Sequence, residues 1–346
     1  MNKEVILTGI RSNDELTLGN YLGAFMPIID MAKQHAGQYQ VNMFVPDLHS
    51  FTTPIDHHGF YARTIHNLKL FAASGLPIDN DDVFIYRQSH VPAHSELAWI
   101  LSCFTGFGEA SRMVEFKDKS ERVGDGRVSV GLFNYPILMA ADILLYGAKW
   151  VPVGEDQRQH LELARTLAER LNRQFDKDLF VVPEALEQQQ KFIDRDAAPR
   201  VRSLRDPSKK MSKSVADPAG TILLSDDPEV AAQKITSATT DSEGIIHFDW
   251  EKQPGITNLL QILALLEKKP QAEVNSAWDG KASYGELKEA VAATVKATLQ
   301  DLQDKLKSID ESTLTKKLEA DEAAMNKVAN KTLLKVQRAV GLRDGE

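Results

Sequence analysis

The sequence of 346 residues contains one cysteine, Cys103, so it offers neither an internal disulfide nor a zinc or iron–sulfur site with several cysteine ligands. No stretch approaches the ~20 apolar residues of a membrane-spanning helix. The first residues lead into a short apolar segment that lacks the longer apolar core of a signal peptide. These absences predict a protein of the reducing cytoplasm that has no membrane partner.

Two widespread nucleotide-binding patterns are also missing. The first expected strand is not followed by G-x-G-x-x-G, and G-x-x-x-x-G-K-[ST] occurs nowhere in the chain. A dinucleotide enzyme and a P-loop NTPase are therefore both disfavoured. The formal net charge of −8 argues against a protein that coats nucleic acid without specificity, although a local basic groove on an acidic body can still bind tRNA.

The first half of the chain alternates apolar strand-like runs with helical ones. The expected strands are Val5–Leu7, Val41–Val45 and Val83–Tyr86. Helical spacing between them covers about 22–32, where Pro27 should kink the helix, and about 59–73, where Gly75 should follow the C-terminus. This order predicts an α/β fold with a doubly wound, Rossmann-like parallel sheet, whose ligands bind beyond the carboxyl ends of the strands.

Strand signals end near residue 224, and the rest of the sequence is helical in pattern. The expected helices are 228–238, 256–266, 284–307 and 314–340. We therefore expect a Rossmann-like domain over 1–222 and an all-helical domain over 223–346. The last helix, about 321–346, is a candidate to pack back on the first domain.

The most informative segment is Lys210-Met211-Ser212-Lys213-Ser214. Two ammonium groups three residues apart, with hydroxyls between them, suit a polyphosphate whose charge changes during a reaction. Pro207 and Pro218 bracket the segment, which predicts a loop. A solvated basic loop is the simpler alternative.

A second candidate nucleotide element lies far upstream. The first strand exits through Thr8–Arg11, and the chain continues to Thr17-Leu18-Gly19-Asn20. Gly19 would let a nucleotide approach the start of a helix, whose free N–H groups favour phosphate. A glycine that only forms a turn is the alternative.

Together, Thr17–Asn20 and Lys210–Ser214 resemble the HIGH-type element and the KMSKS loop of class I aminoacyl-tRNA synthetases. Tyr135–Leu144 resembles the amino-acid-binding helix of the tryptophanyl branch, and Val151–Gln157 resembles its following strand and turn. The resemblance runs from the first strand to the last helix.

Asp142 is the residue that bears on the choice of amino acid. A carboxylate inside the apolar run 137–145 is costly unless a donor reaches it. An indole N–H is a donor without acceptor capacity, and Met139 on the same helix face offers an apolar wall for its ring. Val151 and Val153 alternate on an expected strand and could line the same slot. An internal salt bridge for Asp142 and core packing for Met139 are the alternatives.

The resemblance implies a role for each residue that matches a family position. Gln157 and Tyr135 would hold the substrate ammonium and carboxylate. The implied tryptophan-binding residues are Leu7, His49, Tyr135, Met139, Asp142, Ile143, Val151, Val153 and Gln157. The implied ATP-binding residues are Thr8, Arg11, Thr17, Gly19, Asn20, Gly154, Asp156, Met211 and Ser212. The implied phosphate-holding catalytic residues are Lys210, Lys213 and Lys117, with no metal site formed by the protein.

Some positions have a simple structural alternative or depart from the family. His49 could be structural, and Lys117 could be a surface lysine. Arg11–Asp14 replaces the usual loop over the ATP, and Leu7 stands where many relatives carry Phe. The Thr17–Asn20 element also lacks both histidines of the HIGH motif.

The activity implied by the resemblance is that of a tryptophan–tRNA ligase. Tryptophan would attack the α-phosphate of ATP, with Mg²⁺ bound through the nucleotide phosphates, and would then pass to the terminal ribose of tRNA(Trp). The resemblance also implies a homodimer and an anticodon-binding role for the helical domain. A tyrosyl-specific relative shares the fold and both ATP motifs, but residues 139–144 resemble the tryptophan branch. A non-synthetase nucleotidyltransferase would have no use for Asp142, and an inactive paralogue would not need the paired lysines.

Overall fold

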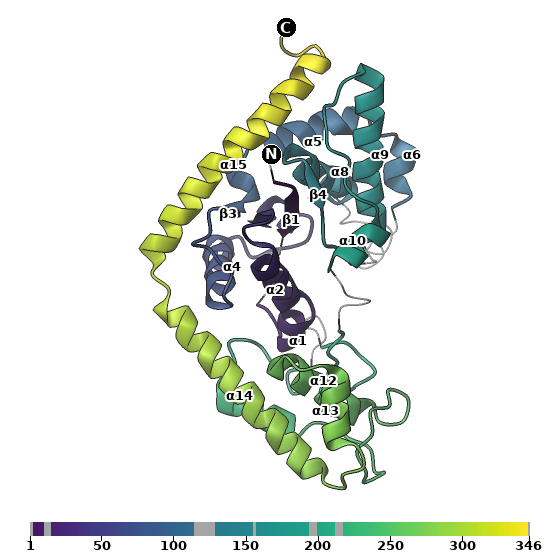
Figure 1. Cartoon of the computed structure of the whole chain (residues 1–346), viewed down its shortest axis with the longest axis vertical. Helices are drawn as coiled ribbons and strands as arrows, with labels where there is room; N and C mark the ends of the chain where they lie inside the picture. Colours follow the sequence, from purple (N-terminus) through teal and green to yellow (C-terminus); the bar gives the residue numbers. More distant parts are fainter. Residues whose placement is uncertain are drawn as a thin grey trace. The chain divides into compact units, whose positions relative to one another are not determined.

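The computed structural model describes residues 3–9, 15–113, 129–154, 157–193, 199–211 and 217–344 (Figure 1). The chain divides into two compact units. The first contains Met1–Asn13, Met31–Asp196 and Asp310–Glu346, and the second contains Asp14–Asp30 and Ala197–Ile309. The boundaries of these units differ from the expected boundary after residue 222. The catalytic role predicted for residues 1–222 and the anticodon-binding role predicted for 223–346 stay predictions.

A four-stranded parallel sheet lies in the first unit. Its strands are β1 (Val5–Gly9), β2 (Gln40–Val45), β3 (Val83–Arg87) and β4 (Ala148–Trp150), in the order β3-β2-β1-β4. The order reverses at β1, because β2 and β3 extend the sheet to one side and β4 to the other. In such sheets the crevice beyond the carboxyl ends of the strands at this switch point is the usual ligand site.

The three strands expected from the sequence are confirmed, but the expected strand through Val151 and Val153 is wrong. β4 ends at Trp150, and residues 151–154 are irregular. Pro152 has no N–H to donate to a ladder. The backbone N–H of Val151 is instead bound by the side chain of Gln189, at 2.8 Å from its Oε1.

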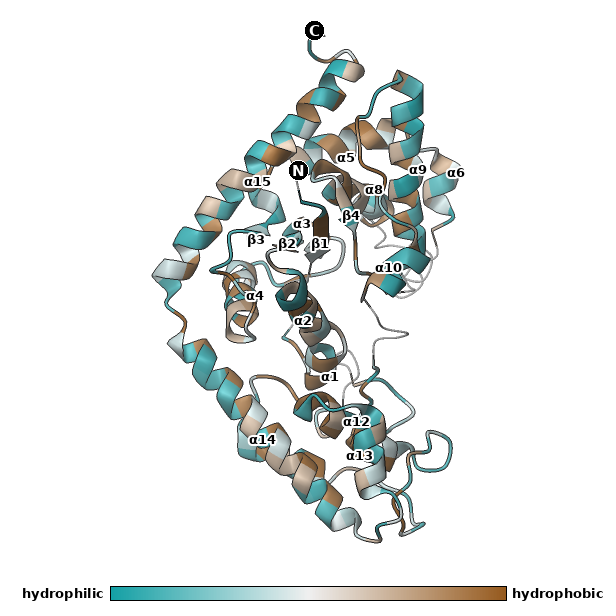
Figure 2. Ribbon diagram, in the orientation of Figure 1, coloured by the Kyte–Doolittle hydropathy of each residue, from teal (hydrophilic) through white to brown (hydrophobic). Residues whose placement is uncertain are grey.

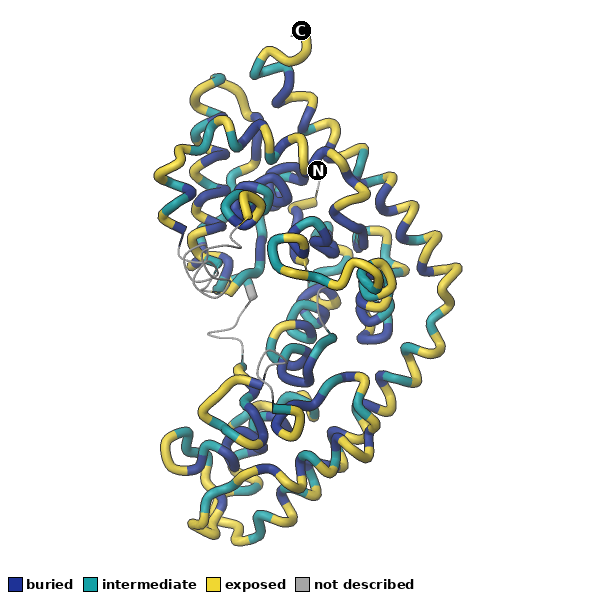
Figure 3. The backbone as a smooth tube through the Cα atoms, turned by 180° about the vertical axis from the view of Figure 1, so that it is seen from behind, coloured by how far each residue is buried: buried dark blue, intermediate teal, exposed yellow. Residues whose placement is uncertain are grey.

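Helices cover both faces of the sheet. Leu7 and Phe44 share a buried cluster with α5 (Ala93–Cys103), α8 (Val130–Leu145) and α9 (Arg158–Phe175). Ile6 and Met43 point to the opposite face and are also fully buried. Buried residues accordingly run through the strands and the inner faces of these helices (Figure 3). This is the doubly wound arrangement that the sequence predicts.

The remaining helices of the first unit are mostly short. They are α3 (Asp47–Ser50), α4 (Phe60–Ala73), the 3-10 turn η2 (Gln88–His90), α6 (Phe107–Ser111) and α10 (Leu186–Ile193). The predicted role of Gly75 after α4 is confirmed, because its φ of +87° is one that side-chain-bearing residues rarely adopt.

The single kinked helix expected near 22–32 is three consecutive pieces. They are α1 (Leu18–Asn20), the π-helix η1 (Tyr21–Phe25) and α2 (Met26–His35). The N–H of Met26 donates to the carbonyl of Tyr21, five residues back. Pro27 cannot donate to the preceding turn, so the wide π-helical turn directly before it is the local accommodation.

The second unit contains three of the four helices expected after residue 224, together with one that was not expected. α11 (Pro228–Thr236), α12 (Pro254–Glu267) and α14 (Tyr284–Ser308) match expected ranges, and α13 (Gln271–Trp278) was not expected. Asp227 caps α11 by accepting from backbone N–H groups of its first turn, and Ser283 does the same for α14. α14 packs against α11 and α12.

The long final helix α15 (Glu311–Ala339) belongs to the first unit and covers the outer edge of β3. Teal and brown residues alternate along α15, as expected for a helix with one buried face (Figure 2). The N–H of Ile85 donates to Asp321 at 2.8 Å, and the N–H of Arg87 donates to Glu322 at 3.2 Å. The guanidinium of Arg87 also donates to both oxygens of Glu322, at 2.7 and 2.9 Å. Carboxylates of α15 thus bind backbone groups that an unpaired edge strand would leave open.

At the opposite edge of the sheet, β4 is bound by the side chain of Gln189 and by the backbone N–H of Glu184, which donates to the carbonyl of Lys149 at 3.0 Å. Gln189 of α10 is buried, and besides binding the N–H of Val151 it donates to the carbonyls of Lys149 and Glu184 at 2.9 and 3.0 Å. The irregular segment after β4 therefore starts from a fixed position. The part of the chain that the structure describes contains no helix with the length and apolar content needed to cross a lipid bilayer.

The closed edge at β3 predicts a large loss of stability in Glu322→Ala. This substitution leaves the largely buried guanidinium of Arg87 without its anionic partner, which typically costs about 3–5 kcal/mol. Glu319→Ala on the exposed face of the same helix is the control and should change the free energy of unfolding by less than about 0.5 kcal/mol. The measurement is chemical denaturation at neutral pH, and equal losses in both variants would contradict a role for the edge contact.

Candidate functional site

Asp142, on α8, is a fully buried carboxylate that three side chains contact. Nε2 of His49 lies 2.8 Å from Oδ2, while Nδ1 of His94 and Nε2 of Gln88 lie 2.6 and 2.7 Å from Oδ1. These partners come from α3 after β2, from α5, and from η2 after β3. An ionised carboxylate can only accept, so each of these nitrogens donates a hydrogen.

The environment keeps Asp142 ionised. Burial on its own raises the pKa of this carboxyl, but the charge and hydrogen bond of His49, together with His94, outweigh it and lower the pKa to about 2. A carboxylate has about four acceptor positions. Among the described residues Oδ1 has two donors and Oδ2 has one, which leaves one acceptor position on Oδ2. The internal salt bridge that the sequence analysis gave as the alternative role of Asp142 is therefore present. Among the described residues it leaves room for one more hydrogen-bond donor.

Gln88, His94 and Tyr146 were missed by the sequence analysis. His94 uses both ring nitrogens, because Nε2 lies 2.8 Å from the hydroxyl of Tyr146. Burial strongly raises the pKa of Tyr146, so this phenol stays protonated. A sequence signal was available for Gln88, which lies two residues after the expected strand Val83–Tyr86, at the carboxyl end where ligands bind.

A second polar chain begins next to His49. The ring of His49 lies edge-on to that of Tyr135, with centroids 6.2 Å apart. The hydroxyl of Tyr135 is 2.9 Å from Nε2 of His160, whose Nδ1 is 2.8 Å from Oε1 of Gln157. The structure thus brings Asp142, His49, Tyr135 and Gln157 into one series of contacts. His160, which is buried between two of them, was not identified from the sequence.

The apolar residues expected near Asp142 also come together. Leu7, Ile143 and Val151 are buried in the cluster that contains much of α8, and Met139 and Val153 pack against that cluster. Of the other first-unit residues, Thr8 is buried near the end of β1, and Gly154 is the last residue of the irregular segment after β4.

The two ATP-type motifs meet in the second unit. Thr17 caps α1 by accepting from the N–H of Asn20 at 3.1 Å, and its hydroxyl donates to the Asn20 side chain at 2.8 Å. A Cβ on Gly19 would lie 3.1 Å from the Cβ of Met211, a very close contact. Gly19 therefore allows α1 to approach the segment that carries Lys210.

Lys210 stands at the end of a short antiparallel hairpin. It pairs with Arg202, and the N–H of Met211 donates to the carbonyl of Val201 at 3.1 Å. The buried side chain of Asn258 binds both the N–H and the carbonyl of Arg202, at 2.8 and 3.0 Å. The Arg202 guanidinium lies 4.0 Å from the ring centroid of Trp250. Asn258 and Trp250, neither of which the sequence analysis found, thus fix the base of this hairpin.

Five predicted site residues lie outside the described residues. They are Arg11, Lys117, Asp156, Ser212 and Lys213. Within the described ranges, no group of three or more His, Cys, Asp or Glu side chains is arranged to hold a metal ion.

Comparison with known proteins identifies the family. The model of the class I tRNA synthetases (W and Y) matches residues 2–300. Tryptophan–tRNA ligase of Clostridium perfringens is 42% identical over 342 residues, covering 98% of each chain. The chain belongs to the tryptophan–tRNA ligase family. The Corynebacterium glutamicum member is 44% identical over 339 residues, covering 97% of this chain and 94% of the relative.

Solved structures agree with this family. Tryptophanyl-tRNA synthetase of Mycoplasma pneumoniae has a TM-score of 0.79 and 34% identity, covering 99% of each chain. The Campylobacter jejuni enzyme, complexed with ADP and tryptophan, has a TM-score of 0.77 and 29% identity, covering 97% of this chain and 99% of that one. A tyrosyl-tRNA synthetase of Aeropyrum pernix shares the fold alone, with a TM-score of 0.66 and 17% identity, covering 93% of this chain and 90% of that one.

The lowered pKa of Asp142 predicts a characteristic pH dependence of stability. Its stabilising contribution is fully present above the unfolded pKa, near 3.8, and is lost as the pH falls toward about 2. The gap in unfolding free energy between wild type and Asp142→Asn should therefore widen as the pH rises through that window. Denaturant unfolding at several pH values between about 2 and 5 measures it.

Asp321→Asn is the control, because its effect on the free energy of unfolding should change with pH in the opposite direction. Burial raises the pKa of Asp321, so its contribution is present below the unfolded pKa and is lost as the pH rises through the folded pKa. The gap between wild type and Asp321→Asn should narrow with rising pH. If the differences in unfolding free energy for the two variants changed in the same direction with pH, His49 and His94 would not offset the cost of burying the Asp142 carboxylate.

Proposed function

We propose that the protein activates L-tryptophan with ATP and transfers it to tRNA(Trp), the reaction of its family. The observation that supports this most directly is the buried Asp142 carboxylate, which stays ionised and, among the described residues, has one acceptor position on Oδ2 without a donor. An indole N–H matches that position because it donates and cannot accept. A phenol would also bring an acceptor that Asp142 cannot satisfy, which favours tryptophan over tyrosine.

The residues around Asp142 supply the rest of the amino-acid site in this proposal. Leu7, Met139, Ile143, Val151 and Val153 form the apolar walls for the indole ring. Tyr135 and Gln157 would bind the substrate ammonium and carboxylate, and the buried His160 between them would orient both.

Adenylate formation then needs no protein nucleophile. The tryptophan carboxylate attacks the α-phosphate of ATP, an aminoacyl-adenylate forms, and pyrophosphate leaves. Positioning and charge stabilisation would provide the acceleration, as in phosphoryl transfer generally. In the second step a terminal ribose hydroxyl of tRNA attacks the carbonyl of the adenylate, and AMP leaves.

For the nucleotide we assign the residues of both ATP-type motifs. In the second unit these are Thr17, Gly19, Asn20, Met211 and Lys210, with Ser212 and Lys213 following in the sequence. Thr8, Arg11, Lys117, Gly154 and Asp156 complete the set. The ADP complex of the Campylobacter jejuni relative supports nucleotide binding in this family.

Mg²⁺ would be held through the phosphate oxygens and water. Loss of the exchange reaction in excess chelator and its recovery with added magnesium would support this. Exchange that persists without divalent cation would contradict it.

We also propose that helices of residues 223–346 bind the anticodon of tRNA and that the aminoacylation of tRNA takes place in the cytoplasm. A further proposal is that the protein is a homodimer. Trp99, Phe107 and Val130 expose more than two thirds of their surface on α5, α6 and α8. The ring of Phe107 stacks on that of Phe133 of α8, with centroids 5.2 Å apart. Exposed large apolar side chains on neighbouring elements are typical of an interface. A monomer in sedimentation velocity would contradict this proposal.

The test of the amino-acid assignment is ATP–pyrophosphate exchange without tRNA. Exchange should depend on L-tryptophan and not on L-tyrosine. An analogue with sulfur in place of the ring N–H should be rejected by ~10⁴ or more in kcat/KM, because the acceptor on Asp142 is left unpaired. The scale is borrowed from the tyrosine enzyme, which rejects a substrate lacking the hydroxyl by about 10⁵. Asp142→Asn should narrow this gap. Equal activation by tyrosine would disprove the assignment, and unchanged discrimination in the variant would make Asp142 structural.

The lysine loop generates a separate prediction. Lys213→Ala should slow adenylate formation by ~100–1000-fold while leaving tryptophan affinity nearly unchanged, since its charge acts where negative charge develops. Lys210→Ala should act in the same direction to a smaller extent. Lys209→Ala is the matched control, because Lys209 pairs with Asp206 at 2.9 Å and should be dispensable. Single-turnover kinetics with tryptophan binding measured in parallel distinguish the two steps. Weak tryptophan binding with a normal rate would contradict the role.

A further inference from the structure

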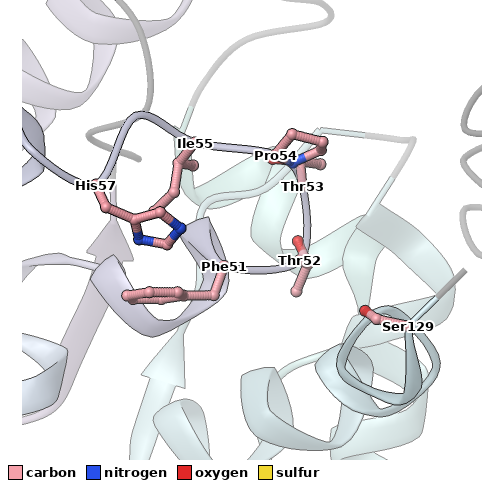
Figure 4. Close-up of a pocket in the computed structure, with 7 residues that line it drawn as sticks. All are labelled: Phe51, Thr52, Thr53, Pro54, Ile55, His57 and Ser129. Atoms are coloured by element: carbon pink, nitrogen blue, oxygen red, sulfur yellow. The ribbon is translucent and has the colours of Figure 1, made fainter. Parts of the chain in front are cut away.

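A pocket of about 220 Å³ lies where the loop after α3 faces the start of α8 (Figure 4). Its lining includes Thr52, whose hydroxyl donates to the carbonyl of His49 at 2.8 Å, and Ser129, which caps α8. The pocket is therefore built on the segments that hold the amino-acid site. The contact between Arg202 and Trp250 belongs to the second unit, and the reaction steps leave it unexplained.

Arg202 joins the hairpin that carries Lys210 to the residues around α12. It pairs with Lys210 across the hairpin, and its backbone N–H and carbonyl are bound by the side chain of Asn258. Its guanidinium lies 4.0 Å from the ring centroid of Trp250, and its Nη1 donates to the carbonyl of Pro207 at 3.0 Å. One side chain therefore contacts both the turn of the hairpin and an aromatic ring outside it.

The hairpin depends on contacts from outside it. Within the turn, the N–H of Ser203 donates to the carbonyl of Lys209 at 2.9 Å. A two-stranded hairpin is only marginally stable by itself in water. The guanidinium of Arg202 adds a hydrogen bond to the carbonyl of Pro207, which lies in the turn. The position of Lys210 should therefore depend on how firmly that guanidinium is held.

Trp250 is itself fixed by the turn that precedes α12. The N–H of the neighbouring Asp249 donates to the hydroxyl of Thr257 at 2.8 Å. The ring of Phe248 lies nearly edge-on to that of Trp250, with centroids 6.1 Å apart. An indole is the aromatic side chain that attracts a cation most strongly, and a planar guanidinium can stack on its face. The ring therefore offers a fixed surface for Arg202.

We propose that Trp250 is a positioning residue for adenylate formation, because its ring holds the guanidinium of Arg202 and thereby places Lys210 against the phosphates of ATP. The inference rests on the proposed function, in which Lys210 stabilises the charge on those phosphates. A displacement of about 1 Å at such a group can cost ~100-fold in rate. Other residues bind tryptophan, so its affinity should not depend on Trp250.

The test is single-turnover adenylate formation, with tryptophan binding measured in parallel. Trp250→Leu keeps apolar bulk but removes the aromatic face. It should slow adenylate formation by about 5- to 30-fold, the range for a cation–π contact that is partly shielded from water, and should leave tryptophan affinity unchanged. Trp250→Phe keeps an aromatic face and should recover most of the rate.

Trp278→Leu is the matched control, because Nζ of Lys281 lies 4.4 Å from the centroid of the Trp278 ring. The same substitution there removes a cation–π contact from another half-buried tryptophan of the second unit, which is not part of the hairpin. Trp278→Leu should change the rate by less than about 2-fold. A loss of rate equal to that in Trp250→Leu would overturn the inference, because damage anywhere in the unit would then act alike.

The Lys210→Ala background supplies the second arm. There Trp250→Leu should slow the reaction by less than about 2-fold further, because the positioned ammonium is already gone and the effects of coupled residues do not add. A full additional loss in that background, or weakened tryptophan binding in Trp250→Leu, would overturn the inference. A normal rate in Trp250→Leu beside a slow Lys210→Ala would overturn the inference alone. If Lys210→Ala forms adenylate at the wild-type rate, the proposed role of the lysine loop fails, and the inference with it.

Discussion

One buried negative charge organises the first unit. Asp142 has no contact with bulk water, and an uncompensated charge there would be strongly destabilising. Its three donors arrive from three separate segments, after β2, after β3 and from α5. Each of those segments must therefore adopt its observed position for α8 to pack. Within the described part of the chain, the same contacts that stabilise the charge leave one acceptor position on Oδ2, so folding and the proposed recognition of the indole depend on one group.

The strands that present these segments are held by side chains at both edges of the sheet. Asp321 and Glu322 of α15 close the edge at β3, and Gln189 binds the chain at the edge formed by β4. Asn258 binds both backbone groups of Arg202 in the second unit in the same manner. In each case a side chain replaces a missing strand. A small sheet or hairpin can then end where a ligand-binding segment begins without leaving buried backbone groups unpaired.

Much of the fold could be predicted from local pattern. Three strands and the long helices of the second half follow from apolar periodicity and from capping residues such as Asp227 and Ser283. β4 was misplaced because Val151 and Val153 alternate like a strand, while the pairing partner of Ala148–Trp150 is distant in sequence. The π-helix before Pro27 and the short α13 likewise depend on the surrounding structure, which the helix propensities of single residues do not describe.

The sequence by itself determined the family, because ordered motifs such as Thr17–Asn20, Lys210–Ser214 and the segment around Asp142 persist as linear patterns. The tertiary structure decided which groups serve those motifs. Gln88, His94 and His160 lie in segments that carry no motif of their own, and their partners are brought together only by packing. Hydrogen bonds need atoms within about 3 Å, and sequence spacing cannot specify such distances between residues that are 25 to 54 positions apart in the chain.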